Sequence, residues 1–424
     1  MEEVVQTVGF EKYPAYKNSG VEWLGEVPEH WEVKRVKYVL QYQKGKNPRS
    51  ISLEEKGNIY LSMDFLRGKE DRVQYIDNKK GLIEVCEGDI LLLWDGANAG
   101  EFIKAKKGIL SSTMAVVNIR NVDFNFSWYF CNVLEMQLRN STNGMGIPHV
   151  SSSELVNFLF LIPSPSEQKL IANFLDKKIS QIDLIIAQKE QQIELLKERR
   201  QVLIHNAVTR GLRKEVPLKG SGVEWIGEIP EHWKVKRLKY VFTILKRIVG
   251  ELGHDVLSIT QNGIKVKDTE SGEGQLSMDY SKYQIVREGD FAMNHMDLLT
   301  GYVDISNFNG VISPDYRVFN IIDSNCDKNY LLLVLQLCYK NKVFYAHGQG
   351  VSMLGRWRFP AENFNNFLFP IPPLEEQVAI TVYILNANKK ISTAIFRKEK
   401  EIEKLKEYKS TLINNAVTGK IKVS

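Results

Sequence analysis

The sequence predicts an α+β protein with two tandem domains, related by pseudo-two-fold symmetry and separated by two long helices that form an antiparallel coiled coil. First, the block at residues 19–39 recurs at 221–241, with 17 of its 21 positions identical. Second, each half of the chain ends in a heptad pattern of apolar residues, which is typical of paired helices. Third, the stretches between these segments mix the apolar patterns of strands and helices.

The offset of the repeated block indicates whole domains. It amounts to 202 residues (221 − 19), far beyond the roughly 20–50 residues of solenoid repeats. The halves agree again near their ends, where Asn-Ala-Val-Thr occurs at 206–209 and 415–418, and they diverge in between. Shared ends predict a common frame, and divergent middles predict surfaces that face different targets. The expected boundaries are 1–163 and 213–372 for the globular domains, and 164–212 and 373–424 for the helices.

Short patterns within the globular parts predict their elements. Apolar runs at 89–94 and 114–119 predict strands. Segments 128–138 and 330–339 predict helices. Gly and Asn are dense between these segments, which is typical of loops.

The heptad pattern places apolar residues at two positions of a helical seam. Lys189 and Arg200 interrupt the first helix, and Lys398 and Lys409 interrupt the second at an offset of 209 residues (398 − 189). Matching phase and interruptions favour pairing of the two helices with each other. The alternative is that each helix packs only on its own domain. The expected seam consists of Leu175, Ile179, Ile182, Ile186, Ile193, Leu196, Leu203, Ile391, Ile395, Ile402, Leu405 and Leu412.

Composition and charge bound the class of protein. A chain of 424 residues exceeds a single core, and 43% hydrophobic with 25% charged residues is ordinary for globular domains. The net charge of +5 is compatible with nucleic acid. Four scattered cysteines predict neither a disulfide framework nor a zinc site. No apolar stretch could span a bilayer and no signal peptide is visible, so a cytoplasmic protein without a membrane partner is expected.

Basic, amide and aromatic residues gather in the divergent middles. Lys and Arg neutralise phosphates, while Asn, Gln and Arg can form paired hydrogen bonds with base edges. Each residue alone is compatible with a solvated surface group, so the signal is their concentration. The expected DNA contacts are Lys44, Lys46, Arg49, Trp94, Asn98, Lys104, Lys106, Lys107, Asn143, His149, Asn262, Lys265, Asn294, His295, Gln349, Arg356 and Arg358.

A search for catalytic motifs yields none. The phosphate-binding G-x-x-x-x-G-K-[ST] loop and the Pro-Pro-Tyr/Trp tetrapeptide of amino-methyltransferases are both absent. Glu29 and Glu32 faintly resemble a nuclease carboxylate set, but Lys234 replaces Glu32 in the second copy. A metal site cannot exchange a carboxylate for a lysine. We therefore expect no catalytic residue and no metal ligand.

The motifs together resemble the specificity (S) subunits of type I restriction-modification enzymes, over nearly the whole chain. The resemblance rests on W-[LI]-G-E-[VI]-P-x-H-W at 23–31 and 225–233, on Pro residues followed by Glu-Gln before each long helix, and on N-A-V-T followed closely by a glycine near each helix end. It implies that the divergent middles are target-recognition domains and that the helices are spacers. It also implies a non-catalytic chain that binds double-stranded DNA.

The same resemblance implies the partners. Two modification (methyltransferase) subunits and two restriction (translocase and nuclease) subunits are expected, with the helical frame as the docking surface for the modification subunits. S-adenosylmethionine, ATP and magnesium are expected in those partners, and no cofactor in this chain. Unlike middles then predict an asymmetric, bipartite DNA site. The alternatives are a self-contained DNA methyltransferase or nuclease, and a coiled-coil protein scaffold without a DNA role.

Overall fold

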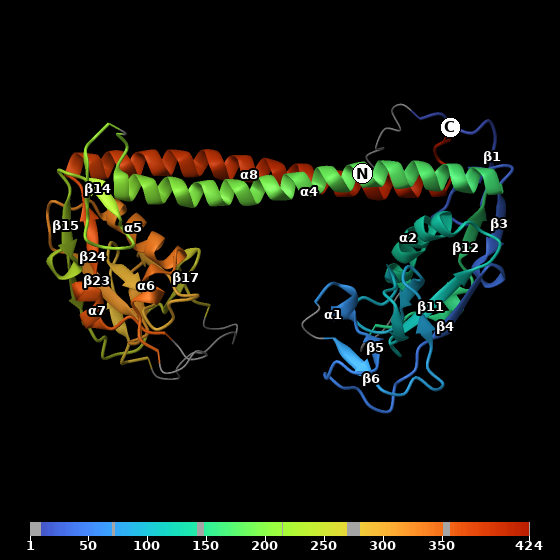
Figure 1. Cartoon of the computed structure of the whole chain (residues 1–424), viewed down its shortest axis with the longest axis horizontal. Coiled ribbons are helices and arrows are strands. Elements are labelled where there is room, and N and C mark those ends of the chain that lie inside the picture. The colour runs from blue at the N-terminus through green and yellow to red at the C-terminus, as the bar shows by residue number, and fades with distance from the viewer. Residues whose placement is uncertain are drawn as a thin grey trace. The chain divides into compact units, whose positions relative to one another are not determined.

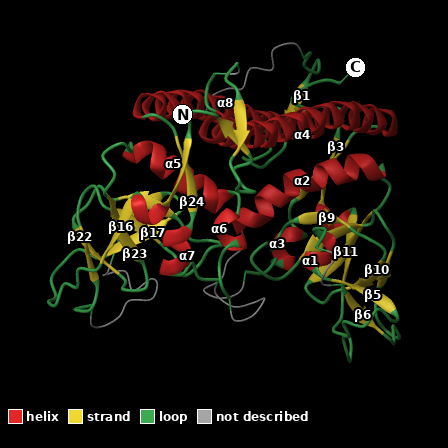
Figure 2. Ribbon diagram, turned by 60° about the vertical axis from the view of Figure 1, so that its left-hand side comes forward, coloured by secondary structure: helices red, strands yellow, loops and turns green. Residues whose placement is uncertain are grey.

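The computed structural model describes residues 10–69, 73–141, 148–213, 215–268, 280–350 and 357–423. It consists of two compact units (Figure 1). Unit 1 comprises Met1–Lys189 and Lys400–Ser424, and unit 2 comprises Glu190–Glu399. Both units combine strands with helices, so the predicted α+β class is confirmed (Figure 2).

The repeated block builds the same two ribbons in each unit. In unit 1, β1 (Tyr16–Asn18) pairs with β2 (Glu26–Pro28), and β3 (Glu32–Arg35) pairs with β12 (Leu159–Ile162). In unit 2, β13 (Leu218–Gly220) pairs with β14 (Glu228–Pro230), and β15 (Lys234–Arg237) pairs with β24 (Leu368–Ile371). A short 3-10 helix follows in each copy, η1 (Val36–Tyr38) and η3 (Leu238–Tyr240). Trp31 and Trp233 are fully buried, so the block is a structural frame.

Unit 1 carries two four-stranded sheets. One has the order β4 (Leu40–Lys44), β11 (Met114–Ile119), β8 (Ile90–Leu93) and β9 (Phe102–Lys104). The other has the order β6 (Gln74–Ile76), β5 (Asn58–Leu61), β10 (Gly108–Leu110) and β7 (Glu84–Val85). The helices are α1 (Met63–Leu66), α2 (Phe124–Ser141) and α3 (Ser152–Leu155). All four residues of β8 are buried, which explains its unbroken apolar run.

Unit 2 repeats the first of these sheets. Its order is β16 (Phe242–Leu245), β23 (Arg317–Ile321), β20 (Phe291–Met293) and β21 (Val303–Ile305). Two ribbons complete the unit, β17 (Leu257–Thr260) with β18 (Gly263–Val266) and β19 (Gln284–Val286) with β22 (Gly310–Ile312). The helices are α5 (Lys328–Lys340), α6 (Val343–Ala346) and α7 (Ala361–Asn366). The strands predicted at 89–94 and 114–119 and the helices predicted at 128–138 and 330–339 correspond to β8, β11, α2 and α5.

Two long helices, α4 (Pro165–Arg210) and α8 (Leu374–Val417), contribute to both units. Within unit 1, Lys409 Nζ lies 2.7 Å from Asp183 and Lys189 Nζ lies 2.5 Å from Glu401. Within unit 2, Arg200 donates to Ser392 Oγ at 3.1 Å, and Lys398 donates to the Gln192 side chain. Partner numbers fall along α8 as they rise along α4, so the helices run antiparallel within each unit (Figure 1).

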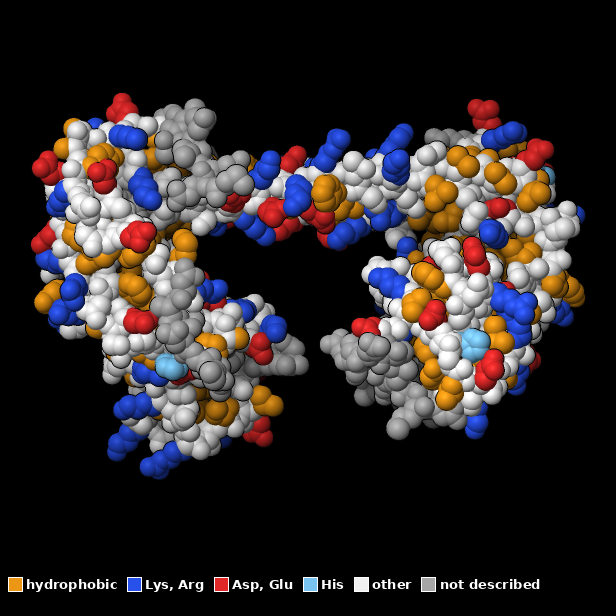
Figure 3. All heavy atoms as spheres, turned by 180° about the vertical axis from the view of Figure 1, so that it is seen from behind, with side chains coloured by type: hydrophobic (Ala, Val, Ile, Leu, Met, Phe, Trp, Pro, Cys, Tyr) orange, Lys and Arg blue, Asp and Glu red, His pale blue; other side chains and the backbone are white. Residues whose placement is uncertain are grey.

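All four cationic interruptions of the heptad pattern therefore reach across to the other helix. The contacts also correspond between the units at the offset of 209 residues. The Lys189–Glu401 contact of unit 1 is equivalent to the Lys398–Gln192 contact of unit 2. The Lys409–Asp183 contact of unit 1 is equivalent to the Arg200–Ser392 contact of unit 2. The apolar positions lie inside. Leu175, Ile179, Ile182, Ile186, Ile193, Ile391, Ile402 and Leu412 are buried, and Leu196, Leu203, Ile395 and Leu405 are half-buried. In Figure 3, Lys, Arg, Asp and Glu side chains intermingle on the exposed surface.

The Glu-Gln pair at the start of each long helix ties that helix to its frame. Glu167 accepts hydrogen bonds from His30 Nε2 at 2.8 Å and from Trp31 Nε1 at 3.4 Å. Ser164 and Glu167 also form a capping box, with Glu167 N donating to Ser164 Oγ and Ser164 N donating to Glu167 Oε2. In unit 2, Glu376 receives the equivalent bonds from His232 at 2.7 Å and from Trp233 at 3.0 Å.

The adjacent glutamine is buried in both units and has a separate task. Gln168 Oε1 accepts from the Asp123 amide at 2.7 Å, and its Nε2 donates to the Pro163 carbonyl at 2.8 Å. Gln377 does the same with the Asp327 amide and the Pro372 carbonyl. One side chain thereby joins the helix start to the segment that opens α2 or α5.

Candidate nucleic-acid interface

The sheet β4–β11–β8–β9 of unit 1 and the sheet β16–β23–β20–β21 of unit 2 share one register. Tyr42 lies opposite Val117 in unit 1, and Ile244 lies opposite Phe319 in unit 2. In each sheet the strands β4 and β8, or β16 and β20, both run antiparallel to the strand between them. They are therefore parallel to each other and end at the same edge. We call this edge, where β4 and β8 end in unit 1 and β16 and β20 end in unit 2, the loop edge.

The loop edge of unit 1 gathers three of the expected DNA contacts. The Lys44 ammonium lies 3.1 Å from Asp95 Oδ2 and 5.2 Å from the centre of the Trp94 ring. Asp95 forms an isolated β-bridge with His149, and the Val150 amide donates to the Trp94 carbonyl at 2.9 Å. Two segments far apart in the sequence are thus held side by side. Lys44 and His149 are exposed, whereas the Trp94 side chain is buried.

The loop edge of unit 2 gathers four more, on the corresponding segments. Gln349 and Arg358 form a β-bridge through hydrogen bonds of 2.8 and 2.9 Å between their backbones. The Phe359 amide donates to the His295 carbonyl at 2.8 Å, and the Tyr339 hydroxyl donates to the Asn294 carbonyl at 2.6 Å. Gln349 and Arg358 are exposed, and Asn294 and His295 are half-buried.

Electrostatics around His295 differ from those of a surface histidine. Burial, followed by the charges of Arg317 and Arg358, lowers the pKa of His295 to about 4. The imidazole is therefore neutral at pH 7, so it cannot neutralise a phosphate. It can still donate or accept a hydrogen bond.

The remaining expected contacts lie elsewhere. Lys46 and Arg49 follow β4 and line a cavity of about 640 Å³ together with Asp77 and Lys80. The Lys104 residue of β9 is paired with Ile90, at the end of the sheet opposite the loop edge. Its ammonium lies 5.1 Å from the Trp128 ring centre, and that of Lys106 lies 4.4 Å from the Phe65 ring centre.

Four further positions complete the placement of the set. Lys107 is exposed just before β10, and Asn98 is half-buried in the loop after β8. Asn262 and Lys265 are exposed on the β17–β18 ribbon, Asn262 in its turn and Lys265 on β18. Asn143 and Arg356 lie outside the described residues. The structure therefore brings together only part of the set, and the assignment of individual contacts stays a prediction.

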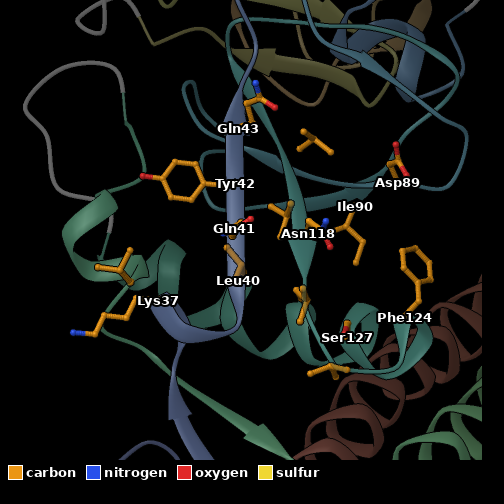
Figure 4. A pocket seen from close by; sticks show the side chains of 15 residues that line it. Lys37, Leu40, Gln41, Tyr42, Gln43, Asp89, Ile90, Asn118, Phe124 and Ser127 are labelled. Atoms are coloured by element: carbon orange, nitrogen blue, oxygen red, sulfur yellow. The ribbon is translucent and has the colours of Figure 1, made fainter.

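A broad groove lies along the sheet β4–β11–β8–β9 of unit 1 (Figure 4). Its volume is about 790 Å³, and Figure 4 shows polar Gln43, Asn118 and Asp89 around it together with apolar Ile90 and Phe124. Its lining contains none of the expected DNA contacts. The candidate nucleic-acid interface is therefore the loop edge and not this groove.

Sequence reasoning missed two residues at the loop edges. The Tyr42 ring lies 4.6 Å from that of Trp94, and buried Arg317 donates to the backbone carbonyl of Phe359. The sequence carried no signal for the burial of Arg317, since an arginine at the first position of a strand is ordinarily exposed. Within the described residues, no helix has both the length and the apolar character needed to cross a membrane.

Comparisons with known proteins identify the family of this chain. A family model described as the type I restriction modification DNA specificity domain matches residues 28–195 and 230–406. The chain is 33% identical over 420 residues to the type I restriction enzyme MjaVIII specificity subunit of Methanocaldococcus jannaschii, covering 94% of each chain. It is 25% identical over 266 residues to the type I restriction enzyme EcoDI specificity subunit of Escherichia coli, covering 55% of this chain and 56% of the relative.

A solved structure gives the same result at the level of the fold. It is described as the structural basis of complex assembly and conformational transition of the type I R-M system. The TM-score is 0.65 at 13% identity, and the match covers 92% of this chain and 98% of the other.

Proposed function

This chain belongs to the type I restriction-modification DNA specificity family and is a DNA sequence-recognition subunit, and from this premise we propose that each unit reads one half of an asymmetric, bipartite duplex site. One observation carries the proposal: the two loop edges occupy corresponding places but present unlike side chains. Unit 1 has Lys44, Trp94 and His149 at its loop edge, whereas unit 2 has Asn294, Gln349 and Arg358 at the corresponding place. A common frame with unlike side chains fits two readers of different base sequences.

The long helices act, in this proposal, as an antiparallel coiled-coil spacer between two recognition domains related by pseudo-two-fold symmetry. The buried seam and the corresponding cross-helix contacts, Lys189–Glu401 and Lys398–Gln192, support it. The domains would span 1–163 and 213–372, with spacer helices at 164–212 and 373–424. Expected half-site centres lie about one helical turn apart, ~34 Å, because both readers approach the same side of the duplex.

The catalytic steps would belong to other subunits. We propose a non-catalytic chain that directs two modification and two restriction subunits to the DNA site, with S-adenosylmethionine, ATP and magnesium bound in those partners. The similar solved structure, which concerns complex assembly of the type I R-M system, supports such partners.

Lengthening the spacer tests the proposal. One heptad inserted after Gln192 in α4, with another after Lys398 in α8, keeps the seam in phase and adds ~10 Å at 1.5 Å per residue. Mapping of methylated sites in cells that also carry the modification subunits should then show the gap widened by about three base pairs, with both half-sites unchanged. Seven residues inserted after the exposed Glu251 serve as the control. An unchanged gap after the helix insertions would contradict the spacer.

The alternatives predict different measurements. A self-contained methyltransferase would bind labelled S-adenosylmethionine as the isolated chain. A protein scaffold would show no salt-dependent duplex binding, even with modification subunits present.

A further inference from the structure

Arg317 is a buried cation at the loop edge of the unit 2 sheet, where it is the first residue of β23. Its side chain is only 5% exposed, and its neighbours Val318 and Phe319 are fully buried. The strand register identifies its counterpart in unit 1. Arg317 lies opposite Met293, as Ala115 lies opposite Leu92, and Ala115 is fully buried as well. The corresponding sheet of unit 1 forms with an alanine at this position, so the fold does not require a cation there.

The contacts of the guanidinium are with backbone and ring atoms. Arg317 Nη2 donates to the Phe359 carbonyl at 2.8 Å, and its Cζ lies 4.9 Å from the Phe364 ring centre. Nη1 is buried and has no hydrogen-bond partner among the described residues, which also provide no ion pair to Arg317. Burial lowers the pKa of Arg317 to about 10, so the group remains charged at neutral pH.

Such a group is costly to keep. A buried guanidinium without a carboxylate partner destabilises a fold, and a carbonyl hydrogen bond and a ring contact offset only part of that cost. Hydrophobic residues in the same place commonly stabilise a fold relative to a buried charge. Retention of Arg317 is therefore not explained by stability.

The position of Arg317 suggests what it does. The backbone carbonyl of Phe359 accepts a hydrogen bond from Arg317, and the backbone amide of Phe359 donates one to the His295 carbonyl. His295 follows β20, and Arg358 directly precedes Phe359. One guanidinium thus fastens the junction of the two segments that form the unit 2 loop edge.

The two charged groups that act on His295 are both cationic. Arg317 and Arg358 both act on His295, and the Nδ1 atom of that imidazole is buried without a partner among the described residues. The Tyr339 hydroxyl, which the Arg317 charge also reaches, holds the Asn294 carbonyl at 2.6 Å. Loss of the guanidinium would therefore change both the geometry and the polarity of this edge.

We propose that Arg317 is a positioning residue that holds the two segments of the unit 2 loop edge together and thereby determines which half-site unit 2 accepts. Arg317 acts through Phe359 and His295, and not by touching the bases. This inference rests on the proposed function, because it assumes that unit 2 reads one half of a bipartite site.

The test uses the full chain with its modification subunits and genome-wide mapping of methylated sites. Exchange of residues 220–372 for those of another family member first assigns one half-site to unit 2. In Arg317→Met the assigned half-site should become degenerate, with methylation of the original site falling at least tenfold, while the other half-site stays unchanged. Arg287→Met is the matched control, because Arg287 is exposed and precedes β20, at the other end of the strand from His295. It should leave both half-sites unchanged.

Salt dependence separates positioning from direct phosphate contact. The slope of log K against log salt should be the same in Arg317→Met and wild type, whereas a lost phosphate contact would reduce it by about 0.9. Arg317→Lys, which keeps a donor for Phe359, should restore part of the specificity. If unit 2 of Arg317→Met does not fold by hydrogen exchange, Arg317→Gln is held to the same criteria. An unaltered half-site in a folded variant overturns the inference, and a wild-type site that is not bipartite overturns the proposed function instead.

Discussion

Gly419, which follows α8, lies so close to Pro28 that a Cβ atom on it would stand 2.4 Å from Pro28 Cδ and 3.1 Å from Trp31 Cη2. Gly211, which follows α4, faces Trp233 in the same way at 3.1 Å. The end of each long helix therefore packs on the repeated block of the other copy. This exchange explains why the last residues of the chain belong to unit 1.

The first prediction concerns that contact. Gly419→Ala should destabilise unit 1 by about 2–4 kcal/mol, because Gly419 has a φ of +73° and the added methyl group meets the Pro28 ring. Hydrogen exchange resolved by segment should show faster exchange in unit 1 and unchanged exchange in unit 2. Gly88→Ala is the control, since Gly88 has a φ of +90° with nothing within 4 Å of the added atom. It should cost only the backbone strain, ~1–2 kcal/mol. Equal effects of the two substitutions would contradict the packing argument.

The second prediction concerns the buried amide of Gln377. Gln377→Leu removes its bonds with the Asp327 amide and with the Pro372 and Asn325 carbonyls, and leaves those groups without these partners. The expected loss is about 2–4 kcal/mol in unit 2, measured by denaturant unfolding with segment-resolved exchange. Gln191→Leu makes the same change at an exposed site on α4 and should cost less than ~0.5 kcal/mol.

The third prediction is a pH dependence in unit 1. Burial alone would raise the pKa of Glu167, but hydrogen bonds from Ser164, His30 and Trp31 together lower it below its usual 4.5. A carboxylate whose pKa is lower in the folded state stabilises the fold above the unfolded pKa, and that contribution is lost as pH falls through the folded pKa. Glu167→Gln should therefore be less stable than wild type at pH 7.

Thermal unfolding followed over pH checks this sign. The difference between Glu167→Gln and wild type should shrink as the pH falls below about 4.5. Glu22→Gln alters an exposed carboxylate of the same unit and should track the wild type at every pH. A difference that grows toward acid pH would mean that the sign is wrong.

The fourth prediction ranks the forces between the helices. A double-mutant cycle of Lys409→Ala and Asp183→Ala should give a coupling of only about 0.5–1 kcal/mol, because both side chains are partly exposed to water. Ile402→Ala in the seam should cost about 2–4 kcal/mol, since Ile402 is buried. We expect the apolar seam to hold the helices and the ion pairs to select their register. A coupling larger than the Ile402 effect would reverse that order.

Local patterns predicted much of the fold because they reflect local physics. The run at 89–94 became β8 since a strand buried on both faces needs unbroken apolar residues. The helix expected from residue 164 corresponds to α4, whose start is fixed by a capping box of Ser164 and Glu167, a contact between residues close in sequence. The residues of the loop edges were only partly predicted. Lys104 and Lys44 are both lysines near an apolar run of the sequence, but Lys104 lies at the opposite end of the sheet from Lys44.

The sequence by itself determined that the chain has two like frames, two helices of matching phase and two unlike middles, because repetition and periodicity are properties of residue order. Only the tertiary structure decided that the last residues of each copy complete the other unit, and that Arg317 lies buried where its counterpart is Ala115. Both follow from contacts between residues distant in sequence. No local pattern encodes such contacts, since they depend on how the strands register and on which surfaces the folded chain brings together.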